Sequence, residues 1–269
     1  MSNTDKRPIG IFDSGVGGLT IVKEVIEVLP KEDIIYFGDT ARVPYGSKSK
    51  ELVYKFSCQI IRFLKEKNVK AIIIACNTVS SNCYEDLKKE FFDIPIIEVL
   101  EPGVKSAIKV TKNNKVGVIG TEATIRSGEY ERKLKENIKD IQVYSKSCPL
   151  FVPLAEEGFL EDKITVDVAE KYLKDLKNYN IDSLILGCTH YPLLKESIKK
   201  VMGDKVKIVN PAFETALKMK NYLQQNNLEN KNGGSHKFYV SDKNDKFDFI
   251  CSLVLKENHI AEKVSIENY

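Results

Sequence analysis

Two cysteines occupy positions where a thiol could carry out acid–base chemistry. Cys76 directly follows the apolar run VKAIIIA, and Cys188 directly follows IDSLILG, so each comes at the end of an expected buried strand. An expected helix follows each of them, and the partial positive charge at a helix N-terminus favours a thiolate. Both also have polar neighbours that can form hydrogen bonds. The sequence therefore predicts two thiols that exchange protons.

The remaining cysteines fit other expectations. Free cysteine is among the most often buried residue types. Cys58, Cys83 and Cys251 fall in helical patterns without an activating neighbour, and we expect them to pack in the core. Cys148 lies in an expected loop and has no matched partner. Six cysteines without a CxxC pair indicate reduced thiols in a reducing compartment.

His190, two residues after Cys188, has two interpretations. It could be a surface or helix-cap histidine, or it could exchange a proton with the Cys188 thiol. A metal site is not expected, because two cysteines and a histidine on separate loops, without CxxC or HxxxH spacing, do not describe zinc ligands.

A glycine-rich segment, DSGVGG at 13–18, follows the expected strand PIGIF. It lacks the GxxxxGK[ST] spacing of a phosphate loop, and its leading acid would repel a pyrophosphate. A tight turn accounts for the glycines but not for Asp13 and Ser14. The position at a strand end favours a small ligand over a nucleotide.

The elements that must position these residues follow an α/β pattern. Short β-branched runs alternate with amphipathic segments, which predicts a mostly parallel sheet flanked by helices. Two longer segments, 121–137 and 191–202, have helical patterns, and the polar stretch 226–235 predicts an exposed loop.

The pattern restarts in the middle of the chain. IGIFDSGVGG matches VGVIGTEAT in form, and VKAIIIACNT matches IDSLILGCTH, so Cys76 and Cys188 hold equivalent places. We expect two similar lobes, formed by 1–98 plus 210–269 and by 99–209, with the active site in the cleft between them. Ligands bind at the carboxyl ends of parallel strands, where helix N-termini converge.

The composition excludes several partners. With 41 Lys plus Arg against 38 Asp plus Glu, the net charge is +3, and no basic patch of the kind that nucleic acid requires is evident. The first residues lack the apolar core of a signal peptide, and no segment approaches the roughly 18 apolar residues of a membrane span. We expect a cytoplasmic protein.

Five motifs together carry a family resemblance. FDSGVGGLT, YFGDTARVPYG, ACNTVSS, CPLFVPLAEEG and LGCTHYPLL, in that order between about Pro8 and Pro211, resemble the glutamate racemases of the cofactor-independent aspartate/glutamate racemase family. The resemblance implies interconversion of L- and D-glutamate without pyridoxal phosphate or a metal. It also implies a role in peptidoglycan synthesis, and hence in cell-wall biogenesis and cell shape, and a homodimer.

The resemblance also implies residue roles. Cys76 would deprotonate D-glutamate and Cys188 would deprotonate L-glutamate, assisted by Asp13 and His190 respectively, and Glu156 would lie near the second thiol. The implied substrate contacts are Asp13, Ser14, Tyr45, Gly46, Asn77, Thr78, Thr121, Thr124, Thr189 and His190.

The chemistry suits such a site. An α-proton beside a carboxylate is weakly acidic, so its removal needs a base near Cα and donors for the developing charge. Enantiomers are mirror images at one carbon, so similar groups are needed on both faces. Two alternatives stay open: a racemase of aspartate or another α-substituted acid, and a non-catalytic amino-acid-binding protein of the same fold.

Overall fold

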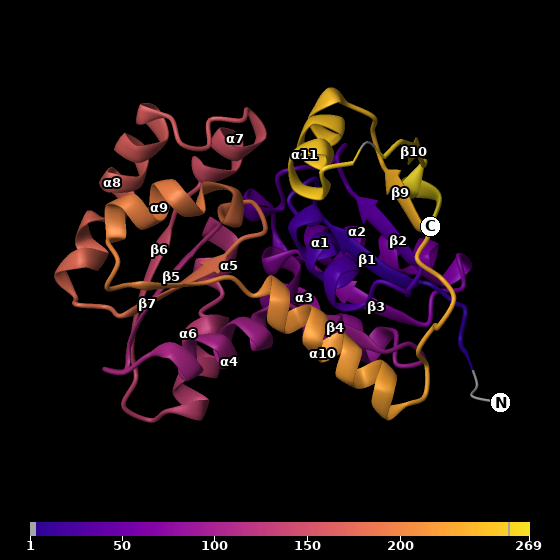
Figure 1. The fold of residues 1–269 in the computed structure, drawn as a ribbon, viewed down its shortest axis with the longest axis horizontal. Coiled ribbons are helices and arrows are strands. Elements are labelled where there is room, and N and C mark those ends of the chain that lie inside the picture. Colours follow the sequence, from indigo (N-terminus) through magenta and orange to yellow (C-terminus); the bar gives the residue numbers. More distant parts are fainter. Residues whose placement is uncertain (1–3, 258) are drawn as a thin grey trace.

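The structure consists of two α/β lobes. The computed structural model describes residues 4–257 and 259–269. Within these residues the strands form one sheet of six and one of four, every pairing is parallel, and helices flank both sheets (Figure 1). The expected two-lobed α/β fold is confirmed.

The first lobe contains the first and the last described residues of the chain. Its strands, in their order across the sheet, are β10 (Ala261–Lys263), β9 (His236–Val240), β2 (Ile34–Gly38), β1 (Ile9–Asp13), β3 (Ala71–Ile74) and β4 (Ile96–Glu98). One face packs against α1 (Leu19–Val28), α10 (Ala212–Gln225) and α11 (Asp245–Leu255). The other face packs against α2 (Lys50–Glu66) and α3 (Asn77–Glu90), with the 3₁₀ turns η1 (Tyr45–Ser47) and η3 (Ile266–Asn268) nearby.

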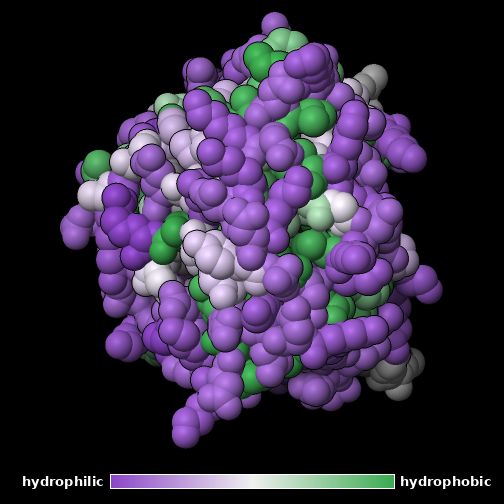
Figure 2. All heavy atoms as spheres, turned by 90° about the vertical axis from the view of Figure 1, so that its left-hand side faces the viewer, coloured by the Kyte–Doolittle hydropathy of each residue, from purple (hydrophilic) through white to green (hydrophobic). Residues whose placement is uncertain are grey.

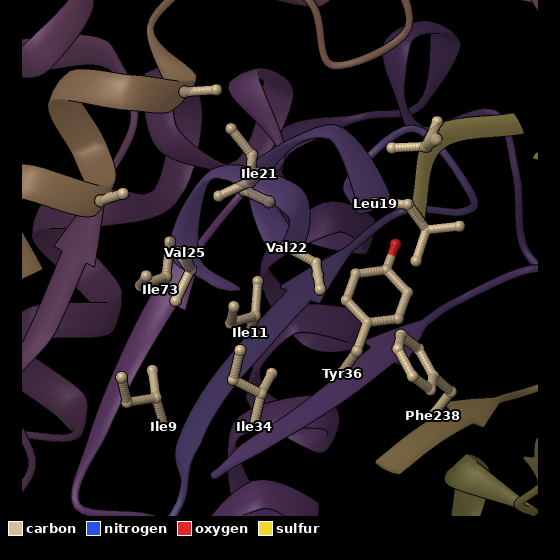
Figure 3. Close-up of a cluster of buried hydrophobic side chains, with 14 of the residues drawn as sticks. Ile9, Ile11, Leu19, Ile21, Val22, Val25, Ile34, Tyr36, Ile73 and Phe238 are labelled. Atoms are coloured by element: carbon tan, nitrogen blue, oxygen red, sulfur yellow. The ribbon is translucent and has the colours of Figure 1, made fainter. Parts of the chain in front are cut away.

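Alternating side chains divide this lobe into two cores. Ile9 and Ile11 of β1 point to the side of α1, and Phe12 points to the side of α2 and α3. Figure 3 shows Val22 of α1 near Ile11, and the ring of Tyr36 between Val22 and Phe238. The Tyr36 hydroxyl donates to the Gly15 carbonyl at 2.6 Å, so the core also fixes the loop after β1.

The second lobe is smaller. Its strands, in order, are β6 (Gln142–Ser147), β5 (Lys115–Gly120), β7 (Ser183–Gly187) and β8 (Lys207–Val209). One core contains α7 (Phe151–Glu156), α8 (Lys163–Asn178), the 3₁₀ turn η2 (Tyr191–Leu194) and α9 (Lys195–Met202). The other contains α4 (Leu100–Val110) and α6 (Glu129–Asn137), and α5 (Glu122–Arg126) follows β5.

The two sheets repeat one topology. The order β2-β1-β3-β4 in the first lobe corresponds to β6-β5-β7-β8 in the second. Cys76 follows β3 and Cys188 follows β7, so the two thiols hold the same position in each repeat. The similarity of the lobes that the sequence predicts is therefore present in the strand order.

Local structure differs from expectation in two segments. The helix expected over 121–137 is broken into α5 and α6 at Gly128, whose φ of +67° is a left-handed conformation that favours glycine. The helix expected over 191–202 begins as the 3₁₀ turn η2 and becomes α-helical only at Lys195. Three short strands, β4, β8 and β10, and the helices α4 and α7 were not predicted. The strands and α7 span too few residues to show a clear period, and Pro102 and Gly103 near the start of α4 are residues that commonly mark a turn.

The division into 1–98 plus 210–269 and 99–209 stays a proposal. In its favour, β4 ends at Glu98 and β8 ends at Val209, so each proposed boundary directly follows a strand.

The outer surface of the second lobe is mostly polar, as expected for amphipathic helices that turn their apolar sides to the core. Figure 2 looks onto the side formed by the second lobe and shows a mostly hydrophilic face with small, separate hydrophobic groups. Among the described helices, none has the length and apolar character needed to cross a membrane.

Candidate active site

The loops at the carboxyl ends of both sheets meet at one small cavity. Its volume is about 30 Å³, which is room for about two water molecules. Its lining comes from both lobes and consists of Ser14, Val43, Pro44, Tyr45, Gly46, Cys76, Asn77, Thr78, Thr121, Val152, Glu156, Cys188, Thr189 and His190. Most of the residues that the sequence singled out therefore lie around one small cavity.

Cys76 contributes a buried thiol from the first lobe. It is the N-cap residue of α3 and is 4% exposed. Burial, together with the nearby charge of Asp13, raises the pKa of this thiol to about 12, although hydrogen bonding with Ser14 and the Val79 backbone opposes the rise. At neutral pH Cys76 is therefore a protonated thiol, the form that can deliver a proton.

Cys188 contributes the thiol of the second lobe in a different setting. The helical segment that follows it begins with the 3₁₀ turn η2, whose first hydrogen bond runs from the Tyr191 amide to the Cys188 carbonyl at 3.2 Å, and it continues into α9. Its side-chain neighbour is the imidazole of His190, with Sγ and Nδ1 3.8 Å apart. Cys188 therefore has an ionisable side chain beside it in addition to the start of a helical segment.

His190 links Cys188 to Glu156. Its Nε2 lies 3.1 Å from Oε1 of Glu156. Burial alone would lower the pKa of His190, but its hydrogen bonds with Cys188 and Glu156 outweigh burial and raise this pKa to about 10. Burial likewise acts to raise the pKa of Glu156, yet the interaction with His190 keeps it below its usual value. The three residues form a thiol–imidazole–carboxylate chain, in which the imidazole can take the thiol proton and the carboxylate orients the ring.

Asp13 lies behind the cavity wall. It is fully buried at the end of β1, and its Oδ2 accepts hydrogen bonds from the amides of Gly18 at 2.9 Å and Gly15 at 3.3 Å. Burial raises its pKa, which the charge of His190 and these amides only partly counteract. The hydroxyl of Thr189 lies 3.4 Å from both carboxyl oxygens, so Asp13 also joins the two lobes.

The remaining predicted substrate contacts have distinct places. Thr78 and Thr121 face each other across the lobes, with their hydroxyl oxygens 2.9 Å apart. Thr124 lies behind Thr121, 3.0 Å away from hydroxyl to hydroxyl, and is not part of the cavity lining. Among the described residues, the lining contains neither lysine nor arginine, so hydroxyl, amide and backbone groups are the donors available to a carboxylate.

Tyr45 and Gly46 are held by a buried network. The Tyr45 hydroxyl donates to Asp39, which also accepts from Arg42 Nε at 2.8 Å and from the Ser241 hydroxyl at 2.7 Å. Ser241 follows β9 and lies 202 residues after Asp39 in the chain. The loop after β2 therefore depends on the C-terminal segment for its shape.

Several residues of the site were missed from the sequence. Val43, Pro44 and Val152 line the cavity, and the Tyr130 hydroxyl donates to Oδ1 of Asn77 at 2.6 Å. The positions of the first three inside the YFGDTARVPYG and CPLFVPLAEEG motifs could have indicated them. Nothing local marks Tyr130, because its partner lies in the other lobe.

The site is built from acid–base groups. Within 4–257 and 259–269, no group of three or more His, Cys, Asp or Glu residues is arranged to hold a metal ion. The groups present are two thiols from opposite lobes, each with an ionisable neighbour. Such a site can remove a proton from one side of a bound molecule and return one from the other side.

Comparisons with known proteins give a consistent picture. The family model described as Asp/Glu/Hydantoin racemase matches residues 10–216. A curated glutamate racemase of Thermoanaerobacter pseudethanolicus is 47% identical over 98% of this chain and 100% of its own.

Two solved structures extend this similarity to the fold. The crystal structure of glutamate racemase from Francisella tularensis in complex with D-glutamate has a TM-score of 0.92 and 43% identity, covering 98% of this chain and 100% of its own. The glutamate racemase of Aquifex pyrophilus has a TM-score of 0.81 and 47% identity, covering 95% and 98% respectively.

Proposed function

The chain belongs to the Asp/Glu/hydantoin racemase family, and on that premise we propose that it interconverts L- and D-glutamate by proton transfer at Cα. The observation that carries the proposal is the position of Cys76 and Cys188, which line one cavity from equivalent strand ends of opposite lobes. The relatives named above support glutamate as the substrate.

The proposed reaction uses one thiol as base and the other as acid. For L-glutamate, the Cys188 thiolate, with its proton held on His190, removes the Cα proton, and the Cys76 thiol delivers its own proton to the opposite face. The C–H bond broken on one face is thus replaced by a new C–H bond on the other. For D-glutamate the roles reverse, and Asp13 then assists Cys76.

The two half-sites begin from different proton states. The raised pKa of Cys76 keeps this thiol protonated, and the raised pKa of His190 keeps the imidazole charged beside Cys188. This state suits attack on L-glutamate directly. Attack on D-glutamate requires the proton to leave Cys76 first, and Asp13 is the carboxyl group nearby to accept it.

Substrate access requires the lobes to separate. A cavity of about 30 Å³ holds about two water molecules and must widen to admit an amino acid. Closure around the substrate would exclude water and bring both thiols to Cα, where a general base acts by position and a matched pKa. Hydroxyl and amide groups such as Ser14, Asn77 and Thr189 would then bind the substrate carboxylates and stabilise the charge that develops at Cα.

The proposal includes a cellular role. D-glutamate formed in the cytoplasm would supply peptidoglycan synthesis, and thus the cell wall and cell shape, without a cofactor. The gene should restore growth to a bacterium that lacks its own glutamate racemase in medium without D-glutamate. We also propose a homodimer, which sedimentation velocity would test.

Incubation with L-glutamate in D2O tests the chemistry. With no cofactor added, ¹H NMR should show loss of the Cα proton while circular dichroism decays to zero. A protein that binds glutamate by calorimetry but exchanges no Cα proton would be a binding protein and would contradict the proposal. A parallel incubation with L-aspartate separates a glutamate racemase from an aspartate racemase.

A further inference from the structure

One lysine of the first lobe reaches the acid–base chain of the second. Lys246 lies in the first turn of α11, and its Nζ is 2.7 Å from Oε1 of Glu157 and 3.7 Å from Oε2 of Glu156. Both glutamates are at the C-terminal end of α7. Figure 1 shows α7 and α11 facing each other across the boundary between the lobes.

A second contact lies one turn further along α11. Gly158, directly after the two glutamates, has φ of +79°, and a Cβ built there would lie only 2.9 Å from Cζ of Phe249. The Phe249 ring therefore rests on the backbone at Gly158. Because Lys246 and Phe249 are three residues apart, they lie on one face of α11, and both contact the segment 156–158.

We propose that Lys246 is a positioning residue for the proton transfer: from the opposite lobe it holds the Glu156 carboxylate against His190 when the lobes are closed. This inference rests on the proposed function. Lys246 does not line the cavity and acts only through Glu156.

The geometry of Glu156 carries the argument. One carboxylate oxygen, Oε1, meets His190 inside the site, and the other, Oε2, faces Lys246 toward the surface. The side chain of Glu156 is 15% exposed, whereas that of Lys246 is 45% exposed. The carboxylate is thus shared between a buried imidazole and an accessible ammonium group, and the ammonium group limits how the carboxylate can turn.

The contact is suited to repeated opening. The side chains of Lys246 and Glu157 are 45% and 55% exposed, and an exposed ion pair contributes only about 0–1 kcal/mol. Such a pair can break each time the lobes separate and form again on closure. The acid–base chain would then be complete only in the closed site.

Four variants test the proposal with both enantiomers as substrates. Lys246→Met removes the ammonium group, and Lys246→Arg retains a cation. Glu157→Gln weakens the closer ion pair but leaves Glu156 intact. Lys263→Met is the matched control, because Lys263 forms an ion pair with Asp242 at 2.6 Å on the same lobe, outside the cavity lining.

We expect kcat of Lys246→Met to fall roughly tenfold with little change in KM, since misplacing a reacting group by about 1 Å can cost up to 10²-fold. Lys246→Arg should recover most of the loss, and Lys263→Met should match the wild type. Unchanged kcat in Lys246→Met would overturn the proposal. The proposal would also be overturned if Lys246→Met and Glu157→Gln raised KM equally and left kcat unchanged. Lys246 would then help the lobes to close without positioning Glu156.

A double-mutant cycle tests whether Lys246 acts through Glu156. In a Glu156→Gln background, Lys246→Met should cause little further loss of kcat, because the group that it positions is already altered. A second tenfold loss would show that Lys246 acts by another route and would contradict the proposal.

Hydrogen exchange of the ligand-free protein gives a readout that needs no activity. The amides of Glu157 and Gly158 donate to the carbonyls of Pro153 and Ala155 at 3.0 and 3.2 Å. These amides should exchange faster in Lys246→Met than in Lys263→Met. If the wild type fails to racemise glutamate but this difference is found, the proposed function fails while the contact stands; equal exchange rates would refute the contact itself.

Discussion

At the scale of single residues, Cys76 and Cys188 carry the same functional group in different surroundings. Cys76 is the N-cap of α3 and has a carboxyl group, Asp13, nearby. Cys188 precedes a short 3₁₀ turn and lies beside the imidazole of His190. Equivalent places in the repeat therefore do not give equivalent acid–base partners.

Replacement of either thiol tests the two-base reaction. Cys76→Ala and Cys188→Ala should each lower kcat/KM for racemisation by at least the 10²–10⁴-fold that general acid–base catalysis typically contributes. Because the equilibrium constant between enantiomers is 1, kcat/KM for L- and D-glutamate must fall equally, which checks the assay. Cys58→Ala, in a helix and away from the cavity, is the control.

The same variants predict a stereochemical difference in exchange. Cys76→Ala retains the base proposed for L-glutamate and should exchange the Cα proton of that enantiomer in D2O without inversion. Cys188→Ala should instead favour exchange of D-glutamate. Near-normal racemisation by either variant would refute the two-base reaction.

The His190–Glu156 pair predicts a pH-dependent stability. The pKa of His190 is raised to about 10 from its usual 6.5, so its stabilisation is complete below about pH 6.5 and is lost as pH rises through 10. Between pH 6.5 and 10 the wild type should lose free energy of unfolding as His190 loses its proton. Glu156→Gln removes one partner of His190, so the loss in this variant should be smaller than in the wild type by at least about 1 kcal/mol.

Urea unfolding at both pH values, with a reductant present, measures this difference. Glu161→Gln is the matched control, because Glu161 is an exposed carboxylate on the same lobe. An identical pH dependence in the wild type and Glu156→Gln would exclude a charged His190 paired with Glu156.

At the scale of secondary structure, two glycines end or divide helices by backbone conformation alone. Gly128 separates α5 from α6 with φ +67° and ψ +3°, and Gly203 ends α9 with φ +81° and ψ +168°. A Cβ added at either position meets no atom within 4 Å. Substitution there therefore tests backbone strain without a steric clash.

We expect Gly128→Ala to lower the free energy of unfolding by about 1 kcal/mol, the lower end of the left-handed penalty for an L-residue. Gly203→Ala should cost more, up to about 3 kcal/mol, because its conformation is essentially restricted to glycine. Alanine also lowers the conformational entropy of the unfolded chain, but this effect is the same in both variants and does not change their order. Chemical denaturation checks the order, and an equal or reversed cost would contradict this account.

At the scale of the whole molecule, polar contacts join the lobes around the cavity. The Tyr130 hydroxyl of α6 donates to Asn77 of α3, and the Thr20 hydroxyl of α1 donates to the Thr189 carbonyl at 3.1 Å. Polar groups can exchange such partners for water when the lobes open. The interface is therefore compatible with a cycle of opening and closing.

Tyr130→Phe tests this interface. It leaves the buried Asn77 amide oxygen without its donor, which costs about 1–3 kcal/mol of stability, and it frees a residue proposed to contact substrate. Racemase activity should fall, which a coupled assay measures together with thermal unfolding. Tyr84→Phe, which removes a hydrogen bond to Ile96 within the first lobe, should leave activity unchanged; an equal loss of activity in both variants would refute the interlobe role.

The sequence by itself determined where the long strands end and that Cys76 and Cys188 hold equivalent positions in the repeat. Hydrophobic periodicity is local and fixes where each long strand stops, and parallel strands bring their carboxyl ends to one edge. The repeat of VKAIIIACNT as IDSLILGCTH therefore placed Cys76 and Cys188 at equivalent edges before any contact was known. Short edge strands such as β4 and β8 were not predicted, because three residues are too few to show a hydrophobic period.

Only the tertiary structure decided what surrounds each thiol. His190 lies beside Cys188, Tyr130 donates to Asn77, and Lys246 reaches Glu156 from the other lobe. These partners are set by how one lobe packs on the other, and a local sequence pattern reports only contacts along its own strand or helix. The closed cavity of about 30 Å³ arises from the same packing, because neither lobe encloses it alone.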